Sequence, residues 1–148
     1  MNTKRDSINK VLVKLFNDVM KIEEKCLCTG EFEDLTMTEF HTIEIIGSNR
    51  ERTMSETAKS LNITQGTLTT GVDNLVKKGY VKRGKSANDK RKVVISLTEK
   101  GEKALATHDE FHHDLVTTTL SNLEPEQERV LIKALFNVDS YFRKKYKL

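Results

Sequence analysis

The chain has 148 residues, of which 36% are hydrophobic and 32% charged, and its formal net charge is +3. This length is enough for one domain with a core of its own. No apolar run approaches the ~20 residues that cross a bilayer, and the first ten residues lack the apolar segment of a signal peptide. The sequence also lacks a G-x-S-x-G motif, a phosphate loop and a glycine-rich nucleotide motif, so no enzyme class is predicted.

The first two helices follow from apolar spacing and capping residues. Apolar side chains recur at i, i+3, i+4 and i+7 across residues 8–22, which predicts an amphipathic helix ending before Gly30. Thr36 or Thr38 is the predicted N-cap of a second helix, and Gly47 closes it.

The next two helices form a predicted helix-turn-helix. Thr53 and Glu56 have the spacing of a capping box, which starts a short helix. Thr64 caps the following helix, and Gly79 marks its C-terminal end. Two short helices joined by a tight turn are typical of a DNA-binding helix-turn-helix, and the inner face of the second is predicted to consist of Leu68, Val72, Leu75 and Val76.

A β-hairpin and two long helices complete the chain. Residues 81–83 and 92–97 are predicted strands, with the turn at residues 86–89. Thr98 is the predicted cap of a long helix that runs to about Leu120, and Pro125 lies in the first turn of the last helix. The predicted fold class is therefore mainly α with a small β-wing: a winged helix-turn-helix core with dimerisation helices at both ends.

Positive charge is concentrated around the hairpin. Residues 77–92 contain eight basic side chains and a single acidic one, a net charge of +7, which leaves −4 for the rest of the chain. A basic patch on a slightly acidic body is the footprint expected of a phosphate-binding surface.

The first and last helices both carry broad apolar faces that a small winged-helix core cannot easily bury. A second copy of the chain can bury them through a two-fold interface. Such a homodimer would present two recognition helices to a palindromic site in double-stranded DNA.

The order of elements, with the D-x-R of Asp89-Lys90-Arg91 and the L-T-x-x-G of residues 97–101, resembles the MarR family of winged-helix transcriptional regulators. The resemblance covers nearly the whole chain. It implies one MarR-like domain at 1–148, with dimerisation helices at about 5–29 and 102–146 and a winged helix-turn-helix at about 36–101.

Within this family, residues 40–47, 66–70 and 74–80 resemble the FabT-type regulators of fatty-acid synthesis genes. This resemblance implies a homodimeric repressor whose DNA affinity responds to long-chain acyl groups on acyl carrier protein. No cofactor is required by this interpretation.

Two sets of side chains are predicted to contact DNA. On the recognition helix, Gln and Asn can bond adenine edges and Thr can touch a thymine methyl group, although several of these residues could instead meet phosphates or water. In the wing, Arg91 suits the negative potential of a narrow minor groove, and Asp89 is predicted to hold its guanidinium; the alternative is a solvated surface pair. Lys82, Arg83, Lys85 and Lys90 are predicted phosphate contacts. The predicted DNA-binding set is Thr64, Gln65, Gly66, Thr67, Thr70, Asn74, Lys77, Lys85, Asp89, Lys90 and Arg91.

The histidines suggest a second site. His108 and His112 are four residues apart on one helix, so their rings face the same way. Certain zinc-sensing MarR-like regulators place one Glu and three His ligands between their first, second and fifth helices, and Glu24, His41, His108 and His112 match that pattern. Such N/O ligation suits Zn²⁺. Three alternatives stay open: a zinc site in a regulator of metal-uptake genes, a hydrogen-bonded cluster between helices, or a part in the response to another effector.

Cys26 and Cys28 are two residues apart, a poor arrangement for a disulfide, so a reduced cytoplasmic protein is expected. On a helix they point about 200° apart and cannot bind one metal together. Some MarR-like regulators sense oxidants through a first-helix cysteine, but little beyond Lys25 would lower the pKa of either thiol, so inert thiols are predicted.

Overall fold

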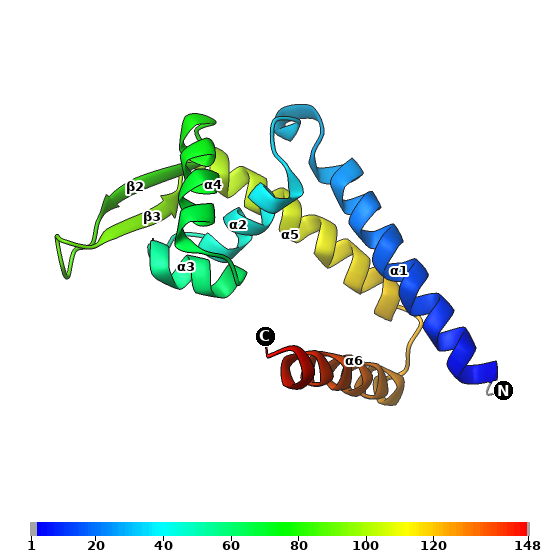
Figure 1. The fold of residues 1–148 in the computed structure, drawn as a ribbon. Helices are drawn as coiled ribbons and strands as arrows, with labels where there is room; N and C mark the ends of the chain where they lie inside the picture. Colours follow the sequence, from blue (N-terminus) through cyan, green and yellow to red (C-terminus); the bar gives the residue numbers. More distant parts are fainter. Residues whose placement is uncertain (1–2, 148) are drawn as a thin grey trace. The chain divides into compact units, whose positions relative to one another are not determined.

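Ten elements, most of them helical, follow one another along the chain in the computed structural model, which describes residues 3–147 (Figure 1). The mainly α fold with a small β-wing is confirmed. In order, the elements are α1 (Thr3–Leu27), η1 (Gly30–Phe32), α2 (Met37–Ile46), β1 (Arg52–Thr53), α3 (Met54–Leu61), α4 (Gln65–Lys77), β2 (Val81–Lys85), β3 (Val93–Leu97), α5 (Glu99–Leu120) and α6 (Pro125–Tyr146). Residues 3–108 form one compact unit and residues 109–147 a second. None of the helices in the described part of the chain is long and apolar enough to cross a membrane.

Side-chain caps fix where the short helices begin. Thr36 is the N-cap of α2: its hydroxyl accepts from the Glu39 amide at 3.2 Å, and the Glu39 carboxylate accepts from the Thr36 amide at 2.9 Å. The same reciprocal pair joins Thr53 and Glu56 at the start of α3. The Thr64 hydroxyl accepts from the Thr67 amide at the start of α4. Each cap satisfies backbone amides that the first helical turn leaves unpaired, and the predicted starts are confirmed.

The core of the first unit lies between α2, α3 and α4. Burial of each large apolar side chain contributes roughly 1.5–3 kcal/mol. The buried apolar side chains of α2 and α4, each exposed by no more than 1%, are Phe40, Ile43, Ile46, Leu68, Val72 and Leu75. This packing places the opposite face of α4 in solvent.

The wing is a three-stranded antiparallel sheet in the order β1-β3-β2. Strands β2 and β3 pair from Val81 opposite Leu97 to Lys85 opposite Val93, and the hairpin projects away from α3 and α4 (Figure 1). The first strand is two residues longer than predicted. The short strand β1 pairs Arg52 with Ile95 and was not predicted, because two residues carry no alternating pattern.

The L-T-x-x-G motif joins the wing to α5. The Thr98 amide donates to the Tyr80 carbonyl at 3.0 Å, and the Thr98 hydroxyl donates to the Gly79 carbonyl. A Cβ atom on Gly101 would lie 2.2 Å from the Tyr80 carbonyl oxygen, so only glycine fits here. Gly79 itself has φ +85°, the left-handed conformation expected after the end of α4.

The long helices leave much apolar surface uncovered. In α1, Glu23 and Leu27 are buried, whereas most of its apolar side chains are exposed. In the second unit, α6 has no buried residue among those described. Its large exposed hydrophobic side chains are Val130, Ile132, Leu135, Phe136, Tyr141, Phe142 and Tyr146.

Candidate nucleic-acid interface

The outer face of α4 presents polar side chains to solvent. The residues predicted to contact bases, Gln65, Thr67, Thr70 and Asn74, are all exposed, as are Thr64, Gly66 and Lys77. The hydroxyls of Thr64 and Thr67 bond each other at 2.9 Å, and the Thr70 hydroxyl donates to the Gly66 carbonyl at 3.3 Å. The Gln65 and Asn74 amides each offer both a donor and an acceptor, the groups that bond adenine edges.

Asp89 shapes the tip of the wing. Its carbonyl accepts from the Lys92 amide at 2.9 Å, and its carboxylate accepts from the Arg91 amide at 3.0 Å. The Arg91 side chain is 93% exposed, with its Nε 3.5 Å from the same carboxylate oxygen. Asp89 therefore orders the backbone that carries Arg91 and also contacts the guanidinium. Lys85 and Lys90 are exposed on the same hairpin.

Carboxylates hold two of the basic side chains near the hairpin. Arg83 of β2 forms an ion pair with Asp73 of α4, so the predicted phosphate contact already has an acidic partner. Lys78 forms an ion pair with Glu39 of α2 at 2.8 Å. Both carboxylates precede residues 77–92, and the charge of that segment alone did not reveal these pairings.

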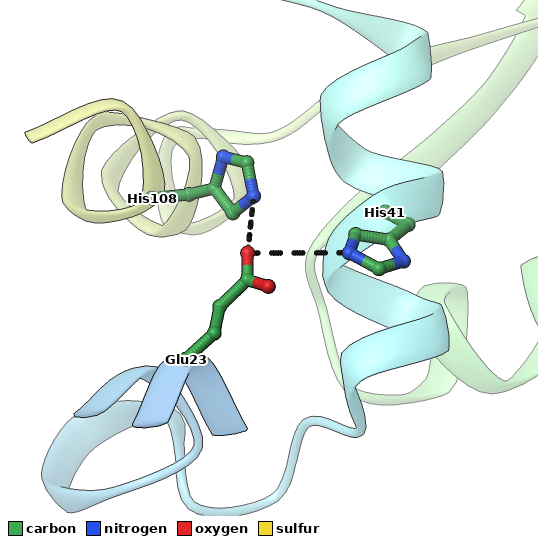
Figure 2. Close-up of side chains that lie close together, drawn as sticks. All are labelled: Glu23, His41 and His108. Carbon is green, nitrogen blue, oxygen red and sulfur yellow. Dashed lines mark ion pairs between the residues drawn. The ribbon is translucent and has the colours of Figure 1, made fainter. Parts of the chain in front are cut away.

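A buried polar cluster lies behind this surface, at the meeting of α1, α2 and α5 (Figure 2). A Glu23 carboxylate oxygen is 3.2 Å from Nε2 of His108 and 4.0 Å from Nε2 of His41. Glu23 is 4% and His108 2% exposed. One potential ligand atom from each of the three residues lies within 4.8 Å of the others. The exposed Glu44 carboxylate is 3.9 Å from His108.

The acidic member of this cluster is Glu23, whereas Glu24 was predicted from the sequence. One residue turns the side chain by about 100° on a helix, and Glu24 is exposed. The expected His41 and His108 do meet here. His112 lies one turn beyond His108 in the second unit, and the three-residue group does not include it.

The environment of Cys28 does not favour thiolate chemistry. Burial raises the pKa of the Cys28 thiol above its usual value, and the charges of Glu24, Glu39 and Glu23 raise it further. A raised pKa lowers the fraction of reactive thiolate at neutral pH. Both cysteines are free thiols.

The chain is similar to known DNA-binding proteins in both sequence and fold. The MarR family model matches residues 35–93, from the start of α2 to the wing. The fold is similar to that of Streptococcus pneumoniae FabT solved in complex with DNA, with 36% identity and a TM-score of 0.86 over 95% of this chain and 98% of that one. It is also similar to an Escherichia coli MarR mutant complexed with operator DNA, with 26% identity and a TM-score of 0.65 over 89% and 93%.

Among curated proteins, the chain is 30% identical over 111 residues to the transcriptional regulator AdcR of Streptococcus pneumoniae, which covers 73% of this chain and 75% of that protein. The chain spans 48–64% of the length of the first curated relatives it matches. Winged-helix geometry, the matched family model and these relatives agree: the chain belongs to the MarR family, whose members are transcriptional regulators rather than enzymes.

Proposed function

We propose that the protein binds duplex DNA with α4 in a major groove and the wing in the adjacent minor groove. The observation that carries this proposal is the exposed polar face of α4 beside a projecting hairpin tipped by Arg91. Lys77, Lys85 and Lys90 are exposed near these elements, where they would contact phosphates. The similarity to FabT and MarR, both solved in complex with DNA, supports DNA binding.

The DNA-binding form would be a homodimer. The apolar side chains exposed on α1 and α6 suit burial against a second copy, since exposed apolar patches mark association surfaces. A two-fold dimer would present two copies of α4 to a palindromic operator, about one turn of DNA apart. This assigns the long terminal helices, at about 5–29 and 102–146, to dimerisation and residues 36–101 to DNA binding.

The proposed role is repression of fatty-acid synthesis genes by a cytoplasmic protein. The proposed effector is a long-chain acyl group on acyl carrier protein. The similarity to FabT over nearly the full length of both chains supports it. Chromatin immunoprecipitation with sequencing in the source organism tests it directly. Enrichment of fatty-acid synthesis promoters, whose transcription rises when the gene is deleted, is expected; their absence among bound sites would rule out this role.

The cluster of Glu23, His41 and His108 favours a second candidate, a zinc-responsive regulator of metal-uptake genes. One carboxylate and two imidazoles, with ligand atoms within 4.8 Å of one another, fit the donor set of a zinc site. A bound zinc ion would tie α1, α2 and α5 together. Isothermal titration calorimetry with zinc tests this candidate: submicromolar affinity lost in His41→Ala would support it, and millimolar affinity would exclude it.

A further inference from the structure

Helix α2 has two polar contacts that face in nearly opposite directions. Glu39 and His41 are two residues apart, so their side chains leave the helix about 200° apart. His41 contacts Glu23 in the buried cluster. Glu39 contacts Lys78, the residue that follows the last turn of α4. Helix α2 thus connects the cluster to the C-terminal end of the recognition helix.

The contact with α4 is a network rather than a single pair. The Lys78 ammonium lies 2.9 and 2.8 Å from the two Glu39 carboxylate oxygens and also donates to the Asp34 carbonyl. The Tyr80 hydroxyl donates to the Asp34 carboxylate at 2.6 Å, and Tyr80 is fully buried. The Lys100 ammonium sits 4.2 Å from the centre of the Tyr80 ring and donates to the Lys78 carbonyl. This network fixes the chain where α4 leads into the wing.

A row of rings joins the same two places. The His108 ring stacks on Phe40 with centroids 6.2 Å apart. Phe40 in turn packs edge-on against Phe32 at 6.1 Å, and Phe32 packs against Tyr80 at 6.3 Å. A shift of one ring in this row displaces the next, because a protein interior is packed as densely as an organic crystal and leaves little free volume between the rings.

We propose that Glu39 is a positioning residue for DNA binding, through which α2 couples the Glu23–His41–His108 cluster to the recognition helix. Any change in the cluster that moves α2 shifts the Glu39 carboxylate and hence Lys78 and the end of α4. The coupling applies to any event that moves the cluster, such as the binding of a metal ion or of a neighbouring effector. This inference rests on the proposed DNA binding.

A double-mutant cycle in operator affinity tests the coupling. Glu39→Gln preserves the capping box, since Gln also serves at the third helical position, but removes the charge that holds Lys78. Glu23→Gln changes the cluster with little change in volume. We expect the effect of Glu23→Gln on operator Kd to differ by about fivefold or more between the wild-type and Glu39→Gln backgrounds, the usual size of an allosteric coupling.

The matched control is Glu56→Gln, which makes the same change in the equivalent capping box of α3. The effect of Glu23→Gln should be the same, within about twofold, with and without Glu56→Gln, as expected of independent sites. A coupling below about fivefold in the Glu39 cycle, or an equal coupling in the Glu56 cycle, would overturn the proposal. If Glu23→Gln fails to fold, His41→Gln takes its place, because His41 is half-buried and tolerates change more readily.

A measurement on the free protein tests the coupling independently of whether the protein binds DNA. In NMR spectra of the free protein, Glu23→Gln should shift the amide signals of Lys78 and Tyr80, and Glu39→Gln should abolish most of that shift. Shifts that persist unchanged in Glu39→Gln would contradict the coupling. A wild-type protein that shows this coupling but has no affinity for duplex DNA would refute the proposed function alone.

Discussion

The surface proposed to bind DNA and the buried cluster of Glu23, His41 and His108 use charge in different ways. In the wing, Arg91 is 93% exposed and lies 3.5 Å from Asp89, a geometry that contributes about 0–1 kcal/mol to stability. In the cluster, Glu23 and His108 are almost fully buried and 3.2 Å apart, so replacing either removes a polar contact from the interior. Substitutions on the outside should therefore change affinity for DNA, and substitutions inside should change stability.

The largest expected loss of stability is at Gly101. Gly101→Ala would place a methyl group 2.2 Å from the Tyr80 carbonyl oxygen and should lower the free energy of unfolding by about 2–4 kcal/mol. Gly71→Ala is the matched control, because a Cβ there meets nothing within 4 Å. This second change should raise stability by up to about 1 kcal/mol through helix propensity. Urea unfolding measures both, and equal effects would contradict the close approach at Gly101.

The second-largest expected loss of stability is in the cluster of Glu23, His41 and His108. His108→Leu removes the buried imidazole that lies 3.2 Å from the Glu23 carboxylate and should cost about 2–3 kcal/mol of stability. His41→Leu should cost less than about 1 kcal/mol, because His41 is half-buried and 4.0 Å from the carboxylate. Urea unfolding at pH 7 compares them. A larger loss of unfolding free energy in His41→Leu than in His108→Leu would show that the contact between Glu23 and His108 is not the main stabilising contact of the cluster.

Tyr80 predicts a stability change at alkaline pH. Burial, and then the hydrogen bond to Asp34, raise the pKa of Tyr80 well above its ordinary value of 10.0. Above pH 10 the unfolded chain releases this proton while the folded protein retains it, so stability falls by about 1.4 kcal/mol per pH unit. Tyr80→Phe should remove this component. Unfolding curves between pH 8 and 11 measure the slopes, and identical slopes would show that Tyr80 ionises normally in the folded protein.

The smallest expected effect is at the tip of the wing. Asp89→Asn keeps an oxygen that can accept from the Arg91 amide but removes the charge beside the guanidinium. Stability should change by less than about 0.5 kcal/mol, as for most exposed positions. Thermal unfolding checks this expectation. A larger loss would mean that the exposed pair stabilises the fold, which would erase the contrast between the two regions.

The helix starts and the exposed face of α4 could be predicted from the sequence, because capping residues and apolar spacing determine them locally. The capping residues Thr53, Thr64 and Thr98 marked three helix starts, and of the two candidates for α2 the structure selects Thr36 over Thr38. The Leu68, Val72 and Leu75 spacing identified which face of α4 is exposed. Leu68, Val72 and Leu75 are buried as predicted, whereas Val76, the fourth member of the predicted inner face, is half-buried.

The contacts behind this surface were harder to predict, because they depend on how distant segments pack. Glu24 was expected where Glu23 lies, since the apolar pattern of α1 does not define a helix face to within one residue. The pairs Lys78–Glu39 and Arg83–Asp73 join residues whose approach no local pattern encodes. The two-residue strand β1 is likewise defined by its partner β3 alone.

The most direct test of the central claim is the salt dependence of duplex DNA binding by the wild-type protein and Arg91→Ala, measured by fluorescence anisotropy on a bound promoter fragment. With about six phosphate contacts in the proposed dimer, log K should fall against log[salt] with a slope of roughly −5. Arg91→Ala should weaken binding by about 1–3 kcal/mol while leaving the dimer intact. Binding that is insensitive to salt and unchanged in Arg91→Ala would contradict the assignment of α4 and the wing as the DNA-binding surface.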